Sequence, residues 1–260
     1  MNILFVGDIV GKPGRRAVRD LLPGLVTVYD VALVIANCEN AAGGFGVTKD
    51  VVDELYDMGI HVLTSGNHIW DKKEIVQFID DYDTLIRPAN YPPATPGRYS
   101  VVMRDHGDRP VGVINIEGRV FMKALDCPFR AIDRIIEAMS RETKCIIVDF
   151  HAEATSEKQA MGWYLDGRVS AVIGTHTHVQ TADERVLPHG TGYITDAGMT
   201  GALNSVLGMR TEDALHRFLT LRPNKFEVAK KNICLNGVLV DVDTSSGRCR
   251  SLARIAVPLD

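Results

Sequence analysis

The sequence predicts an α/β fold in which two packed β-sheets carry helices on their outer faces. Up to about residue 173, short apolar runs rich in Val and Ile alternate with helical patterns, as in a parallel sheet with crossover helices. The region 98–120 instead has two alternating runs around a Gly/Asp/Pro turn, which is typical of a hairpin. After about residue 184 the helical pattern fades, and we expect mostly antiparallel strands that form a second sheet.

The individual elements follow from these patterns in chain order. Buried strands are predicted where the apolar runs occur, at 2–7, 31–37, 60–65, 145–150 and 168–173. Helices are predicted at 14–28, 48–58, 72–80, 128–142 and 156–165. Thr48 is the expected N-cap of the second helix. Two pairs have the spacing of a capping box: Asp71 with Glu74, and Ser156 with Gln159.

The last third of the chain has five further strand-like stretches: GYIT, RFLTL, KFEVAKK, NGVLVDVD and RSLARIAVP. The proline-rich segment at 87–97 is interpreted as a rigid surface loop and not as a domain boundary. Because there is no internal repeat or flexible linker, we expect residues 1–260 to form a single domain.

Composition narrows the class of protein. The chain has 260 residues, of which 45% are hydrophobic and 24% charged, without an apolar run of transmembrane length or a signal-peptide pattern. A cytoplasmic protein that makes no membrane contact is expected, with its five scattered cysteines reduced. A net charge of −4 argues against nonspecific nucleic-acid binding, so an anionic substrate would need a local positive group such as a metal ion.

The segment VGDIVGKPG allows either a phosphate-binding loop using Lys12 or a metal ligand at Asp8. The Walker spacing fails because position 6 is Val and Lys12 is followed by Pro13. The dinucleotide fingerprint fails as well, because Gly7, Gly11 and Gly14 are wrongly spaced. Asp8 then stands just past the first strand, where open α/β sheets bind ligands, and Gly11 and Gly14 become turn residues. Lys12 either faces solvent or approaches a substrate.

Polar residues follow the other predicted strands too. They are Glu39 and Asn40, then Asn67 and His68, then His151, and finally His176 and His178. If the last segment is extended, His176 and His178 point to the same side about 6.5–7 Å apart, which suits two neighbouring metal ions or an ion and a substrate. Carboxylate, amide and imidazole ligands together favour manganese or iron, with zinc as an alternative.

These motifs resemble those of the calcineurin-like metallophosphoesterases over nearly the whole chain. The stretches GDIVGKPGR, NCENAAGGFGVT, SGNHIWD, DFHAEATSEK and GTHTHVQTAD are closer still to the bacterial YmdB-like branch. The resemblance implies a four-layer sandwich of two mixed β-sheets flanked by helices, with two divalent or trivalent metal ions per chain.

Carried over residue by residue, the resemblance implies that Glu39 bridges the metals and that His68 acts on the substrate without binding metal. The first metal shell would comprise Asp8, Asn40 and His178, and the second would comprise Asn67, His151 and His176. This chain departs from the D-x-H pattern of most members, since Val10 follows Asp8-Ile9, and it has Glu39 where most have a bridging Asp. We expect Asn40 to fill the vacant place, which favours harder ions.

Such a site predicts hydrolysis of phosphodiesters, because two metals can activate a bridging water and clamp the phosphate oxygens. His68 would be the general acid. The resemblance points to 2′,3′-cyclic nucleoside monophosphates as substrates, with RNA ends as another possibility and a homo-oligomer as a possible assembly. Phe45, Trp70 and Tyr91 would either stack on a base or anchor their loops.

Three alternatives remain open at this stage: a phosphomonoesterase or nuclease using the same metals, a metal-dependent nucleotide-binding regulatory protein, and a redox-active mononuclear iron site. The full ligand set beside His68 argues against a pure sensor. The number of ligands exceeds what a mononuclear iron site needs.

Overall fold

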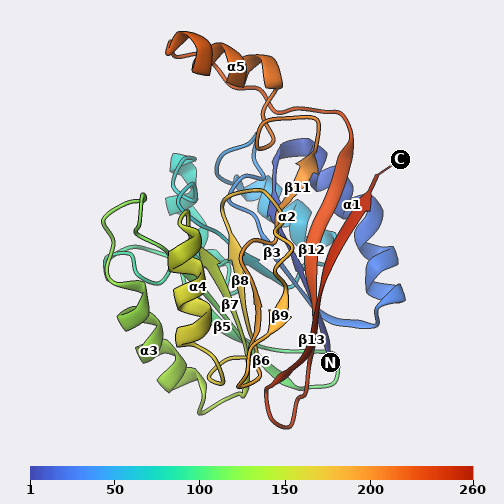
Figure 1. Cartoon of the computed structure of the whole chain (residues 1–260), viewed down its shortest axis with the longest axis vertical. Coiled ribbons are helices and arrows are strands. Elements are labelled where there is room, and N and C mark those ends of the chain that lie inside the picture. The colour runs from blue at the N-terminus through green and yellow to red at the C-terminus, as the bar shows by residue number, and fades with distance from the viewer. Residues whose placement is uncertain (260) are drawn as a thin grey trace.

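The computed structural model describes residues 1–259 and contains two mixed β-sheets (Figure 1). The first sheet has the strand order β2-β11-β12-β1-β3-β4, with β13 paired to β12. Its strands are β1 (Asn2–Val6), β2 (Asp8–Ile9), β3 (Val31–Asn37), β4 (Val62–Thr64), β11 (Met199–Ala202), β12 (Ile233–Val242) and β13 (Cys249–Pro258). The second sheet has the order β5-β6-β7-β8-β10-β9. It comprises β5 (Ser100–Arg104), β6 (Pro110–Glu117), β7 (Cys145–His151), β8 (Ala171–Thr175), β9 (Arg185–Val186) and β10 (Gly192–Ile194).

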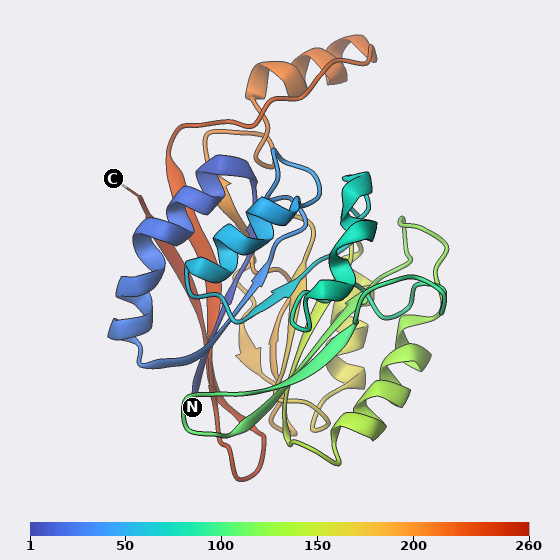
Figure 2. The same cartoon turned by 180° about the vertical axis from the view of Figure 1, so that it is seen from behind.

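Helices cover the outer faces of both sheets and complete four layers (Figures 1 and 2). They are α1 (Gly11–Val28), α2 (Lys49–Asp57), α3 (Pro128–Met139), α4 (Thr155–Tyr164) and α5 (Thr211–Thr220), with the 3₁₀ helices η1 (Lys73–Gln77) and η2 (Ile79–Asp81). Helices α1 and α2 pack on the first sheet, and α3 and α4 pack on the second. Helix α5 projects from the body at one end (Figure 1). The predicted fold class is therefore confirmed.

The alternation of side chains along β1 explains why the layers stack. Ile3 and Phe5 face the core between the two sheets, where they meet apolar residues of β6, β7 and β8. Leu4 and Val6 face the opposite side and pack with α1 and α2. Because successive side chains of a strand point to opposite faces, a strand buried on both sides must be apolar at every position. This explains the continuous apolar run at the start of the chain.

The parallel strands are divided between the sheets, and here one expectation was wrong. Strands β1, β3 and β4 are parallel neighbours in the first sheet, whereas β6, β7, β8 and β10 are parallel neighbours in the second. The C-terminal strands β12 and β13 extend the first sheet and do not form a sheet of their own. An apolar run has the same pattern in either sheet, because both sheets are covered on both faces.

Three of the C-terminal strand predictions also need correction. GYIT forms β10, but it pairs in parallel with β8. RFLTL lies mostly in α5, because Leu215, Phe218 and Leu219 have helical spacing and the acidic residues Glu212 and Asp213 stand in the first turn. KFEVAKK forms no strand. Its only β pairing with the described residues is an isolated antiparallel bridge between Val228 and Met209. The hairpin of β5 and β6 is as predicted.

The helix boundaries differ in places as well. Thr48 caps α2 as predicted, with its hydroxyl accepting from the Val51 amide. Neither capping box forms: Ser156 lies inside α4, whose N-cap is Ala154, and the segment 72–80 forms only 3₁₀ turns. Helix α1 starts at Gly11 and so includes Gly14, where a Cβ atom would lie 2.3 Å from the Thr200 carbonyl oxygen. Gly14 is thus a close-packing residue and not a turn residue.

All five cysteines are free thiols. Among residues 1–259, no helix is both long enough and apolar enough to cross a membrane.

Candidate metal centre

The structure brings all eight predicted site residues together at one end of the two sheets. The first sheet and its loops supply Asp8 in β2, Glu39 and Asn40 after β3, and Asn67 and His68 after β4. The second sheet supplies His151 at the end of β7 and His176 and His178 after β8. The carboxyl ends of strands from both sheets therefore meet, and this is where α/β proteins bind ligands.

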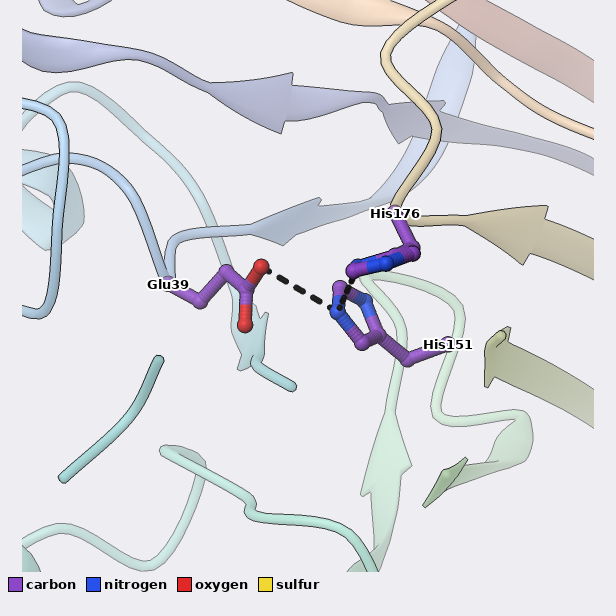
Figure 3. Close-up of side chains that lie close together, drawn as sticks. All are labelled: Glu39, His151 and His176. Carbon is purple, nitrogen blue, oxygen red and sulfur yellow. Dashed lines mark hydrogen bonds and ion pairs between the residues drawn. The ribbon is translucent and has the colours of Figure 1, made fainter. Parts of the chain in front are cut away.

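One cluster of possible metal ligands is centred on His151 (Figure 3). The Nε2 atom of His151 lies 3.1 Å from Glu39 Oε1, 2.9 Å from Asn67 Oδ1 and 3.1 Å from His176 Nδ1. His151 and Glu39 are fully buried. One imidazole nitrogen can make only one good hydrogen bond. A bound cation therefore accounts for these converging oxygen and nitrogen atoms better than hydrogen bonding does.

The protonation states agree with a cation site. Burial favours the neutral forms of both His151 and Glu39, yet their mutual contact raises the pKa of His151 and lowers the pKa of Glu39. The metal-free pair is therefore an imidazolium beside a carboxylate. Burial and the nearby His151 charge lower the pKa of His176 to about 3, which keeps that ring neutral. A metal cation at this point would replace the proton on His151.

A second cluster is built around Asp8 and shares Glu39 with the first. The Asn40 side-chain nitrogen lies 3.1 Å from His178 Nε2 and donates to Glu39 Oε1 at 3.2 Å. His178 Nε2 is 3.7 Å from Asp8 Oδ1. That oxygen is buried without a hydrogen-bond partner among the described residues, and burial raises the pKa of Asp8. A buried carboxylate oxygen without a partner, close to the imidazole of His178, fits a metal ligand, and Asn40 would contribute its amide oxygen.

Each of the three cluster histidines has its second ring nitrogen held by an oxygen. His151 Nδ1 contacts the Thr175 hydroxyl at 2.9 Å, His176 Nε2 contacts Glu153 Oε2 at 3.1 Å, and His178 Nδ1 contacts the Leu207 carbonyl at 3.1 Å. In a neutral imidazole, a proton fixed on one nitrogen leaves the lone pair on the other. All three remaining nitrogens face the clusters, which is how proteins orient metal-ligating histidines.

Asp149 and Thr175 form the support for His151. The Thr175 hydroxyl donates to Asp149 Oδ1 at 2.6 Å, so its oxygen is free to accept from His151 Nδ1. The other Asp149 oxygen accepts from Thr64 and from Asn37, both on the first sheet. Asp149 thus ties the two sheets together beneath the clusters.

We expect Thr175→Val to weaken metal binding by about 10- to 100-fold, because that is the usual cost of losing a partner that orients a ligand. Thr175→Ser retains the hydroxyl and should bind metal like the wild type. Calorimetric titration of the metal-free protein with Mn²⁺ measures both. Equal affinities for the valine and serine variants would contradict this role.

The segment that carries His176 and His178 is a turn and not the extended strand considered from the sequence. Both residues have positive φ, at 99° and 65°, which is strained for residues with a side chain. Thr177 between them is held by Asp196, whose Oδ2 accepts from its amide at 3.1 Å and from its hydroxyl at 2.7 Å. Buried Lys158 pairs with the same oxygen at 2.7 Å. The turn directs the two rings into different clusters.

His68 lies beside the clusters without joining them. Its backbone amide donates to Glu39 Oε2 at 2.9 Å, and its Nδ1 lies 2.8 Å from Asp71 Oδ2. Asp71 therefore orients His68 and does not cap a helix, which explains the missing capping box. The side chain of His68 is 30% exposed, and the ring of Phe45 meets it edge-on with centroids 5.1 Å apart. This leaves Nε2 of His68 available to a substrate.

The glycine of the GNH motif has a structural cause. A Cβ atom on Gly66 would lie 2.2 Å from the His151 ring, so only glycine allows this loop to bring Asn67 against His151.

Three carboxylates near the clusters were not singled out from the sequence: Asp149, Glu153 and Glu117. Glu117 ends β6 in register with His151, and burial raises its pKa. Neither its carboxyl oxygens nor the Tyr91 hydroxyl have a hydrogen-bond partner among the described residues. Glu117 stands at a strand's carboxyl end, which is the signal that identified the other site residues.

The three aromatic residues and Lys12, which the sequence placed near the site, differ in whether they line the cavity beside the clusters. Phe45 lines a cavity beside the clusters. Trp70 and Tyr91 are not among the residues that line it, and they pack edge-on against each other with ring centroids 6.2 Å apart. Those two aromatics fit the loop-anchor alternative. Lys12 is exposed and does not line this cavity.

The two packed mixed sheets and the donor cluster at their carboxyl ends define a protein with the metallophosphoesterase-like fold. Within that class, the chain belongs to the YmdB-like protein family, whose model matches residues 4–255. The 2′,3′-cyclic-nucleotide 2′-phosphodiesterase of Bacillus subtilis is 49% identical over 257 residues, which are 99% of this chain and 97% of that protein.

Two solved structures match over the whole chain. A hypothetical protein from Thermus thermophilus has a TM-score of 0.93 and 41% identity, with all of both chains covered. A phosphatase from Mycoplasma pneumoniae has a TM-score of 0.92 and 34% identity, and 94% of that chain is covered.

Proposed function

We propose that this protein is a metal-dependent phosphodiesterase that hydrolyses 2′,3′-cyclic nucleoside monophosphates. The observation that carries the proposal is the orientation of His151, His176 and His178, each with one nitrogen bound to an oxygen and the other facing a cluster of donors. Family membership and the activity for which the Bacillus subtilis relative is named support the choice of reaction and substrate.

The proposed ligand assignment is the one that the family resemblance implies. Asp8, Asn40 and His178 would hold one metal ion, and Asn67, His151 and His176 would hold the other, with Glu39 between them. Bound metal ions supply the positive charge that the phosphate oxygens need and lower the pKa of water, usually to about 7. Manganese or iron suits the mixture of oxygen and nitrogen donors, and zinc is the alternative.

The protein side chains account for the proton on the leaving group. Water adds to phosphorus and releases a proton to solvent while the bond between phosphorus and O2′ breaks. The departing O2′ takes a proton from Nε2 of His68, and the product is a 3′-phosphomonoester. Asp71 holds the other nitrogen of His68 at 2.8 Å and so keeps the ring in one orientation.

The pairing of His68 with Asp71 also favours an enzyme over a nucleotide sensor, because binding alone needs no oriented proton donor. The two clusters of possible metal ligands share Glu39. This arrangement fits two metal ions better than the single iron ion that a mononuclear redox site would hold. A cytoplasmic location and a homo-oligomer remain predictions.

Hydrolysis assays with a substrate panel test the proposal. The panel contains 2′,3′-cyclic AMP, 3′,5′-cyclic AMP, 3′-AMP and a short RNA with a 2′,3′-cyclic phosphate end, each with added Mn²⁺, Fe²⁺ or Zn²⁺. We expect metal-dependent conversion of 2′,3′-cyclic AMP to 3′-AMP with the highest kcat/KM. Faster cleavage of the monoester or of internal RNA bonds would favour a phosphomonoesterase or a nuclease. Tight binding without turnover would favour the sensor.

A further inference from the structure

A cavity of about 360 Å³ opens directly onto the candidate metal centre, which is within the size range of small-molecule sites. One part is lined by polar residues of the centre and its neighbours: Glu39, Asn40, His68, Glu153, His176, Thr177 and His178. The other part is lined mainly by apolar residues of the loop before α5, of α5 and of the segment after it: Val206, Leu207, Met209, Ala214, Phe218 and Phe226. Phe45, from the glycine-rich loop after β3, lies beside His68 in the same cavity.

The apolar part has features that point to a ligand. Leu207 and Phe218 both line the cavity although 50% and 76% of their surfaces are exposed, and apolar side chains exposed together in a patch mark a binding surface, which a single exposed one does not. Ala214 is the only buried residue of helix α5. Ala214 and Phe218 are four positions apart and so lie on one helix face, which is the face toward the cavity.

The charges around the cavity restrict the class of ligand that it can bind. Among residues 1–259, no Lys or Arg lines the cavity. Positive charge for a phosphate inside the cavity would therefore come from the metal centre, since Arg217 lies over the Phe226 ring, 5.4 Å from its centroid, but does not line the cavity. The cavity suits a ligand with one phosphate group joined to an uncharged, flat, apolar body.

We propose that the apolar wall formed by Phe45, Met209, Phe218 and Phe226 binds the nucleobase of the substrate. This assignment rests on the proposed function, because it places the phosphate at the metal centre. Aromatic stacking recognises a base by its face, and every base has such a face. The subsite therefore discriminates little between the four bases.

The test compares Phe218→Ala with Leu219→Ala, which removes an apolar side chain from the same helix that is 81% exposed and does not line the cavity. Two substrates are used: 2′,3′-cyclic AMP and ribose 2,3-cyclic phosphate, which lacks the base. We expect Phe218→Ala to reduce the ratio of kcat/KM for the nucleotide to kcat/KM for the ribose by about 10-fold, within the usual range for one stacking contact. Leu219→Ala should leave the ratio unchanged.

Binding of adenosine to the metal-free protein, followed by NMR, gives a readout that does not depend on catalysis. We expect a weaker dissociation constant in Phe218→Ala and an unchanged one in Leu219→Ala. An unchanged substrate ratio and unchanged adenosine binding in Phe218→Ala would overturn the base subsite, as would a preference above about 100-fold for one base. If the wild type hydrolyses neither cyclic substrate, the proposed function fails, while adenosine binding still tests the subsite.

Discussion

Glu39→Gln should lose tight binding of metal ions at both clusters and reduce phosphodiesterase activity by more than about 10³-fold. Glu39 is the residue that the clusters share, since its Oε1 lies 3.1 Å from His151 Nε2 and accepts from Asn40 at 3.2 Å. Glutamine keeps the shape of the side chain but removes the negative charge. The expected loss is at least that caused by removing one electrostatic stabiliser from an active site. Elemental analysis and cyclic-nucleotide hydrolysis measure it.

Lys12→Ala is the matched control, because Lys12 is an exposed residue in the first turn of α1, close in sequence to Asp8, and does not line the cavity. It should retain both metal ions and full activity. Asp8→Ala should lose the ion beside Asn40 and His178. If Glu39→Gln retained two ions per chain, Glu39 could not be the shared ligand.

His68→Ala should retain both metal ions and lose activity by about 10²- to 10⁴-fold, which is the usual contribution of a general acid. His68 contacts Glu39 only through its backbone amide, so the substitution leaves that hydrogen bond in place. The effect should be much smaller for a p-nitrophenyl phosphodiester, because p-nitrophenolate leaves without protonation. Steady-state kinetics on both substrates separate proton donation from substrate positioning.

His189→Ala serves as the control for removing a histidine, since His189 is an exposed residue that does not line the cavity. It should match the wild type on both substrates. An equal loss on both substrates in His68→Ala would mean that His68 positions the substrate and does not supply the proton.

That the candidate site residues lie together was more predictable from the sequence than the arrangement of the sheets. Polar residues at strand ends, such as Asp8, Glu39 and His151, stand out because the strands before them are almost entirely apolar, and parallel strands bring their carboxyl ends to one edge. The sequence has no comparable pattern to show that β1 and β12 belong to one sheet while β6 and β7 belong to the other. An apolar run is equally suited to the first or the second sheet.

The supporting residues of the site could not be found by spacing. Asp149 lies within the apolar run CIIVDFH, and its partners Thr64, Thr175 and Asn37 come from three other strands. Buried polar groups need hydrogen-bond partners, but the sequence does not tell which distant residues supply them. Helix α5 was missed for a local reason: RFLTL alone is too short to distinguish helical spacing from alternation, and the deciding residue Leu215 stands before it.

The most direct test of the metal centre is anomalous diffraction from crystals grown with Mn²⁺. We predict two anomalous peaks per chain on either side of the Glu39 carboxylate, one beside Asp8, Asn40 and His178 and the other beside Asn67, His151 and His176. A single peak, or two peaks that do not share Glu39, would contradict a dinuclear centre built from these residues.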